Sequence, residues 1–140
     1  MSRKGPIIII EDDVDDQYIL EAVFLQLALR NERKFFSRCE DAFQYLMSTS
    51  DKPFIILSDV NLPGMTGTEL RRQINESDLL RKKSIPFIFF TTYAQKEVVE
   101  KAYEMMVQGY FEKPASVDEL KSMLEAIIKY WQLCKHPNSE

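Results

Sequence analysis

Cysteine and histidine are scarce in this chain, and neither is spaced to bind a metal. The two cysteines, Cys39 and Cys134, are far apart, and the only histidine, His136, lies in a polar tail. Metal sites and disulfide frameworks built from these residues need several of them at short, regular spacings. We therefore expect two reduced thiols, buried or half-buried, and no metal site made from cysteine or histidine.

Long hydrophobic runs are also missing near the N-terminus. Only four isoleucines, residues 7–10, follow the short polar start before acidic residues begin. A signal-peptide core needs roughly 7–15 apolar residues and a membrane-spanning helix about 20. The sequence therefore predicts a cytoplasmic protein that does not enter a membrane.

Positive charge is not in surplus. Lysine and arginine total 18 against 22 aspartate and glutamate residues, which gives a net charge of -4 at pH 7. Nucleic acids and anionic membrane surfaces favour a basic partner. We therefore expect the chain to bind neither of them as its main role.

The remaining composition fits one folded unit. The 140 residues are 45% hydrophobic, enough to bury a single core. The sequence has no internal repeat, linker or low-complexity segment. We predict a single domain over residues 1–140, with its core at about 6–134 and no output domain.

Short apolar runs alternate with helical patterns along the whole chain. Strands are predicted at residues 7–10, 34–39, 54–58, 87–90 and 110–111, and helices at 15–30, 40–48, 66–75, 94–106 and 116–134. A charged loop is expected at 78–83. This alternation is typical of βα units and a parallel sheet. We predict an α/β (βα)5 doubly wound, flavodoxin-like fold, a parallel five-stranded sheet with strand order 2-1-3-4-5.

Polar side chains follow four of these strands at the point where each strand ends. Glu11 and Asp12 follow the first, Asp59 follows the third, Thr91 follows the fourth and Lys113 follows the fifth. In open parallel sheets, ligands bind at the carboxyl ends of the strands. Strands one and three are neighbours in the predicted order, so the acidic pair should lie beside Asp59.

Carboxylates this close resist ionising together, so a pKa rises or a cation sits among them. A few carboxylates with open positions suit Mg²⁺. A carboxylate beside Mg²⁺ and a lysine can attack phosphorus and hold the acyl phosphate that forms. Each residue alone has a plainer explanation as a turn, cap or surface residue, but their joint placement favours a reactive site. We therefore predict Asp59 as the reactive carboxylate, with Lys113 supplying charge and Thr91 a hydroxyl donor.

Four motifs resemble the receiver domain of two-component response regulators, and the resemblance covers nearly all of the chain. The run Ile7–Asp13 is similar to the family's acidic pair after its first strand, and Leu57–Gly67 to its phosphoacceptor stretch. Phe90–Thr92 is similar to its switch threonine, and Tyr110–Pro114 to its switch aromatic and lysine. The acidic pair with Glu first, Asp15-Asp16 and Tyr130-Trp131 also resemble the single-domain receivers that partner bacterial phytochrome-type kinases.

The resemblance implies that Asp59 accepts a phosphoryl group from a phosphohistidine on a sensor histidine kinase, with Mg²⁺ as cofactor. It implies that Asp12 and Asp59 bind the metal directly, Glu11 through water, and Asn61 by its backbone carbonyl. The chain is then a phosphoacceptor rather than an enzyme, apart from hydrolysis of its own acyl phosphate.

The resemblance further implies a conformational switch. Thr91 and Lys113 would hold the phosphoryl oxygens, and Tyr110 would turn inward. The output would be altered contact with the kinase, a downstream phosphotransfer or target protein, or a second copy through helix 94–106, strand 110–111 and helix 116–134. The Lys113-Pro114 bond is cis in relatives, so a cis bond is expected here.

One departure from the family lies before the fifth predicted strand. Relatives usually carry a Gly-Ala pair where this chain has Met106-Val107, so the turn there and its exposure are open. Tyr93 and Asn61 occupy positions at which relatives tune hydrolysis of the acyl phosphate.

Three alternatives were weighed against this interpretation. A haloacid-dehalogenase-type phosphatase would use Asp13-Val14-Asp15, which leaves Asp59 unexplained. A degenerate receiver that acts only as a scaffold should lack part of the reactive set. A flavodoxin should have a Ser/Thr/Gly-rich phosphate loop after the first strand, where this chain is acidic.

Overall fold

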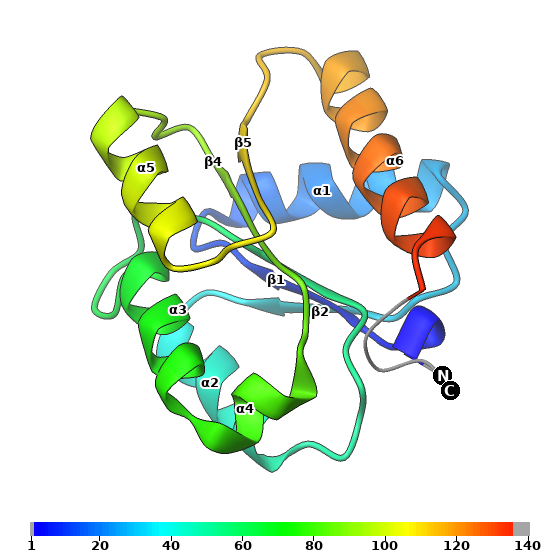
Figure 1. Ribbon diagram of the computed structural model, residues 1–140. Helices are drawn as coiled ribbons and strands as arrows, with labels where there is room; N and C mark the ends of the chain where they lie inside the picture. The colour runs from blue at the N-terminus through cyan, green and yellow to red at the C-terminus, as the bar shows by residue number, and fades with distance from the viewer. Residues whose placement is uncertain (1, 136–140) are drawn as a thin grey trace.

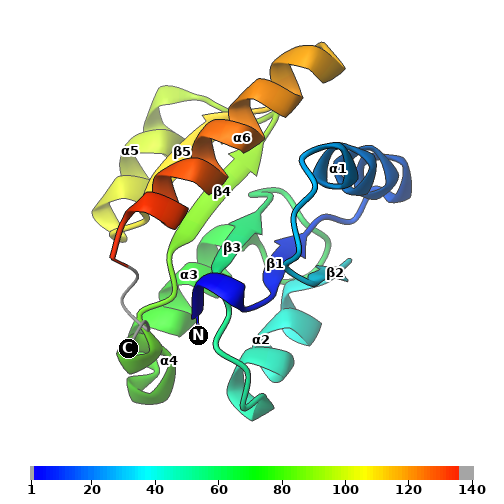
Figure 2. The same ribbon diagram turned by 90° about the vertical axis from the view of Figure 1, so that its right-hand side faces the viewer.

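Five parallel strands form one sheet in the order β2-β1-β3-β4-β5 in the computed structural model, which describes residues 2–135 (Figures 1 and 2). The predicted fold class and strand order are therefore confirmed. The strands are β1 Ile7–Ile10, β2 Arg33–Phe36, β3 Ile55–Ser58, β4 Phe87–Thr91 and β5 Gly109–Glu112.

Helices cover both faces of the sheet (Figure 1). They are α1 Val14–Gln26, α2 Cys39–Ser48, α3 Gly67–Glu76, α4 Asp78–Lys83, α5 Lys96–Glu104 and α6 Val117–Leu133, with a short 3-10 turn η1 at Ser2–Lys4. Helices α1 and α6 pack on one face, and α2, α3, α4 and α5 contribute to the core on the other.

Alternate residues of each inner strand supply these two cores. Ile8 and Ile10 of β1 face the α2–α5 side, whereas Ile7 and Ile9 face α1 and α6. All four isoleucines are buried, as are all residues of β3 and β4. Burial on both faces explains why these strands read as continuous apolar runs in the sequence. It also fixes the register that brings the strand ends together.

Residues 78–83 form helix α4, so the predicted loop is wrong there. Ser77 caps the helix, because its Oγ accepts a hydrogen bond of 3.2 Å from the backbone N–H of Leu80. Leu80 is buried in the core and anchors the helix to the sheet. The helix ends at Lys83, because the next residue, Ser84, has a left-handed φ of 51°.

Two other helices are shorter than the sequence suggested. The first was expected to reach residue 30 but ends at Gln26, because Ala28 adopts a left-handed φ of 56°. The helix expected over 94–106 spans Lys96–Glu104, and Met106 just beyond it has a φ of 62°. A left-handed residue cannot continue a right-handed helix.

The expected cis Lys113-Pro114 bond is wrong, whereas the two free thiols are confirmed. The Lys113-Pro114 bond is trans, since no peptide bond among the described residues is cis; trans is the lower-energy isomer of most X-Pro bonds. Cys39 is free and buried, which raises the pKa of its thiol to about 12, and Cys134 is free and half-buried. His136 lies outside the described residues.

No helix within residues 2–135 is both long enough and apolar enough to cross a membrane.

Candidate functional site

The end of β3 is held tightly between its neighbours, and this places Asp59. The Asp59 backbone N–H donates to the carbonyl of Ile10 at 3.0 Å, and the Gly67 N–H donates to the carbonyl of Val60 at 2.9 Å. A Cβ on Gly67 would lie 2.2 Å from the Asp59 carbonyl oxygen. Only glycine lets α3 approach this closely. The helix therefore packs directly behind the loop that carries Asp59.

Three carboxylates meet at this edge of the sheet. Glu11, Asp12 and Asp59 each offer an oxygen atom, and these atoms lie within 4.8 Å of one another. Glu11 is only 3% exposed. Burial raises the pKa of Glu11 and the charge of Asp59 adds to that rise, although Lys113 opposes it. The cluster has the hard oxygen donors, few in number and partly open, that a divalent cation prefers.

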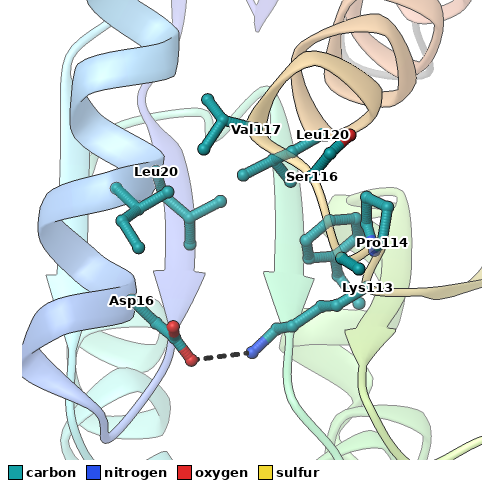
Figure 3. A pocket seen from close by; sticks show the side chains of 10 residues that line it. Asp16, Leu20, Lys113, Pro114, Ser116, Val117 and Leu120 are labelled. Atoms are coloured by element: carbon teal, nitrogen blue, oxygen red, sulfur yellow. Dashed lines mark ion pairs between the residues drawn. The ribbon is translucent and has the colours of Figure 1, made fainter.

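Lys113 reaches into this cluster from the loop after β5. Its Nζ forms an ion pair with Glu11 and lies 3.4 Å from Asp59 Oδ2. It also lies 3.6 Å from Asp16 Oδ2, the ion pair drawn in Figure 3. Burial alone would lower the pKa of Lys113, but the hydrogen bond to Glu11 and the charges of Asp59, Glu11 and Asp16 raise it. The ammonium is therefore fixed as a positive charge beside the reactive edge.

Thr91 completes the predicted group. Its hydroxyl is buried and donates a hydrogen bond of 2.5 Å to Asp59 Oδ1. The Val60 N–H donates to the same oxygen at 2.7 Å. Two donors thus fix the Asp59 carboxylate in one orientation.

A chain of contacts runs from Thr91 to the edge strand β5. The Tyr93 N–H donates to Thr91 Oγ1 at 3.2 Å, and the Tyr93 carbonyl accepts a hydrogen bond from the Tyr110 hydroxyl. The Tyr110 ring packs against Phe89 with ring centroids 5.6 Å apart. Burial, chiefly, raises the pKa of Tyr110 to about 12. Tyr110 is therefore an inward-facing hydrogen-bond donor.

The structure brings five of the seven predicted residues together directly and connects a sixth, Tyr110, through Tyr93. The five are Glu11, Asp12, Asp59, Thr91 and Lys113. Asn61 lies two residues beyond Asp59 in an exposed loop position.

One contact to this group was not foreseen. Asp16, which the sequence offered only as part of the resemblance to phytochrome-associated receivers, pairs with Lys113. Its position in the first turn of α1, just after the acidic residues that follow β1, is the signal that could have found it.

Comparison with known proteins identifies the family of this chain. The family model described as the response regulator receiver domain matches residues 7–125. The chain belongs to this family. Receivers are signalling phosphoacceptors rather than typical enzymes.

Individual relatives agree with that family. The receiver is 26% identical to the transcriptional regulator NtrC of Proteus hauseri over 98% of this chain, which spans 27% of that relative's length. It is also 26% identical to the response regulator Rcp1 of a Synechocystis species, over 89% of this chain and 87% of Rcp1. The chain thus corresponds to about a quarter of NtrC and to most of Rcp1.

Solved structures show the same fold. The phosphorylated cyanobacterial phytochrome response regulator RcpA superposes with a TM-score of 0.86 at 23% identity, over 96% of this chain and 99% of RcpA. The Mn²⁺-bound form of Rcp1 superposes with a TM-score of 0.82 at 25% identity, over 96% and 99%. The narrower likeness to single-domain receivers of phytochrome signalling is therefore confirmed.

A small groove of about 190 Å³ opens beside Lys113, between α1 and the start of α6 (Figure 3). Its walls are mainly apolar and include the exposed Val117. The remaining wall residues include Asp16, Ile19, Leu20, Pro114 and Leu120. The receiver thus presents an apolar surface next to its reactive edge.

Proposed function

We propose that Asp59 is the phosphoacceptor of this receiver and that it takes a phosphoryl group from a phosphohistidine on a sensor histidine kinase. The observation that carries this proposal is the meeting of Asp59 with an ammonium, a hydroxyl donor and two further carboxylates at one strand edge. The rival phosphatase interpretation is not supported, because Asp13 is occupied as the cap of α1 and accepts from the N–H groups of Asp15 and Asp16.

The proposed reaction uses these groups as they lie. An Asp59 carboxylate oxygen attacks phosphorus, the new P–O bond forms as the P–N bond to imidazole breaks, and the imidazole leaves. Lys113, 3.4 Å from Asp59 Oδ2, stabilises charge on the phosphoryl oxygens. The Thr91 hydroxyl donates a hydrogen bond to Asp59 and can donate to the same phosphoryl group once it is attached. Preorganised charge and donors are what phosphoryl transfer asks of a protein.

We propose Mg²⁺ as the cofactor, held by Asp12 and Asp59 directly, by Glu11 through water and by the backbone carbonyl of Asn61. The clustering of three carboxylates within 4.8 Å supports this, and the relative Rcp1 has a Mn²⁺-bound form. When bound, the cation neutralises negative charge on the cluster and on the phosphoryl oxygens.

Removal of the metal provides the direct test. The wild-type chain with acetyl phosphate and Mg²⁺ is expected to gain the mass of one phosphoryl group, and the gain should disappear with EDTA because the carboxylates then repel the incoming phosphate. Intact-protein mass spectrometry measures both. An equal yield of adduct with and without metal would contradict the cofactor proposal.

The proposed output is a switch that alters protein contacts. Phosphorylation would draw the Thr91 hydroxyl and Lys113 toward the phosphoryl group. Thr91 is linked through Tyr93 to Tyr110, and Lys113 follows the same strand, β5. The face made by α5, β5 and α6 would change as a result, and with it binding of a target, a downstream phosphotransfer protein or a second copy.

We further propose that the kinase docks on the apolar groove beside Lys113. Ile19→Glu places a charge at this groove and should slow transfer from a phosphorylated kinase by about tenfold or more, since a disrupted interface anchor costs about 1.4 kcal/mol or more. Phosphorylation by acetyl phosphate should be unchanged, because Ile19 lines this groove and not the space around Asp59.

The matched control is Leu25→Glu, an exposed apolar position at the other end of the same helix. The kinase is one selected for transfer to the wild-type chain. Equal slowing by both variants, or loss of acetyl phosphate reactivity in Ile19→Glu, would count against this docking surface.

A further inference from the structure

A second and larger groove lies at the opposite end of the sheet from Asp59, at the end where α4 is seen in Figure 2. It has a volume of about 610 Å³ and is bounded by α3, α4, the residues just before β4 and β5, and α6. Two arginines and no acidic residue line it, although the chain as a whole carries a net charge of -4. The groove is therefore a local reversal of the protein's charge.

Arg71 is the unusual charge in this groove. It is only 7% exposed, yet no carboxylate pairs with it among the described residues, and burial lowers the pKa of its guanidinium. Its Nε donates to the carbonyl of Met105 at 3.1 Å and its Nη2 to that of Met106 at 2.8 Å. Its Cζ also lies 5.4 Å from the centroid of the Phe87 ring. Carbonyl oxygens and a ring face bring only partial negative charge. Buried charges in proteins are normally paired, so Arg71 retains a positive charge that an anion would neutralise.

The other arginine of the groove does not share this property. Arg81 donates from Nη2 to Asp78 Oδ1 at 2.7 Å and is neutralised by that exposed ion pair. The planar guanidinium of arginine can donate two parallel hydrogen bonds to two oxygens of one acidic group, whereas the lysine ammonium is a point charge. The charge that the groove offers to a ligand is therefore that of Arg71.

The rest of the groove is suited to an apolar body. Met106 lines it with a side chain that is 69% exposed and with a left-handed φ of 62°, which costs a non-glycine residue about 1 kcal/mol. Trp131 lines it from α6, and Ile74, Leu80 and Ile85 add apolar surface. Ligand pockets in proteins are mostly apolar, hold a few fixed polar groups and have volumes of roughly 300–1,000 Å³.

We propose that this groove binds a small organic anion, with its acidic group against Arg71 and its apolar body against Met106 and Trp131. The volume is that of a small-molecule pocket, and the charge of the lining selects an anion. This site shares no lining residue with the space around Asp59.

The test uses naphthalene-2-sulfonate and the uncharged naphthalene-2-sulfonamide as matched probes on the full chain. Trp131 is the only tryptophan and lines the groove, so its indole N–H gives a single NMR cross-peak that reports on this site. Titration should shift this peak saturably, with the sulfonate binding at least about tenfold more tightly than the sulfonamide because a charged hydrogen bond to arginine adds roughly 1.5 kcal/mol or more.

Two variants identify the source of that preference. Arg71→Met should reduce the sulfonate-to-sulfonamide affinity ratio to about one, whereas Arg72→Met, on the exposed side of the same helix, should leave the ratio unchanged. The ratio within one protein is not altered by a general loosening of the groove. A wild-type ratio near one, an unchanged ratio in Arg71→Met, or the absence of a saturable shift would each overturn the proposal.

Discussion

Asp59→Asn is expected to form no acyl phosphate with acetyl phosphate or with a phosphorylated kinase. The amide lacks the nucleophilic oxygen that attacks phosphorus, while it keeps the shape that accepts hydrogen bonds from Thr91 and Val60. The fold should therefore survive and only the chemistry should be lost. Intact-protein mass spectrometry after incubation with Mg²⁺ measures the adduct directly.

Asp51→Asn is the matched control, since Asp51 is an exposed carboxylate just before β3, at the opposite end from Asp59. It should be phosphorylated like the wild type. Incorporation of phosphate into Asp59→Asn at the wild-type rate would refute the assignment of Asp59, and loss of the adduct in both variants would show that the assay reports something other than this carboxylate.

Lys113→Ala is expected to separate phosphorylation from its consequences. Asp59 should still accept a phosphoryl group with Mg²⁺ present, but the phosphorylated variant should not show any self-association that the wild type gains. Lys113 follows β5 in the chain, and its backbone N–H donates to the Thr91 carbonyl at 2.8 Å, so its side chain links the reactive edge to that strand. Size-exclusion chromatography of beryllofluoride-treated samples reads the outcome, with Lys52→Ala on a distant exposed position as control.

The same variant should be less stable, by about 3 kcal/mol at pH 7, because it leaves the buried Glu11 carboxylate without its cation. The pKa of Glu11 is already raised in the folded chain, so protonation favours the fold. The loss of stability should therefore shrink as the pH falls through the raised pKa of Glu11 and grow as it rises. Urea unfolding at several pH values measures this. Self-association of phosphorylated Lys113→Ala at the wild-type level would contradict the role given to Lys113.

The sequence was sufficient to predict the five strands and their order, although the second strand was expected over 34–39 and spans Arg33–Phe36. Runs such as Ile7–Ile10 and Phe87–Phe90 are buried on both faces, which leaves a continuous apolar signal, and parallel order then brings their polar successors to one edge. The site followed from this because Asp59 and Lys113 each stand directly after a strand.

Side-chain contacts between helices and loops could not be predicted from the apolar runs of the strands. Asp16 reaches Lys113 only because α1 lies where it does, and Arg71 meets Met106 across 35 positions of the chain. Helix α4 was missed because its six residues are mostly charged, and only the Ser77 cap and the single buried Leu80 distinguish it from a loop. Non-local contacts of this kind depend on the completed fold rather than on local pattern.

The central position of β3 has a consequence for the time scale of motion. β3 is hydrogen-bonded to β1 on one side and β4 on the other, and all its residues are buried, whereas β5 pairs with β4 alone. Amide protons of β3 should exchange with solvent mainly through global unfolding, and those of the edge strand through smaller openings. Asp59 is thus attached to the slowest-opening part of the molecule, while Tyr110 lies on a strand that can rearrange without it.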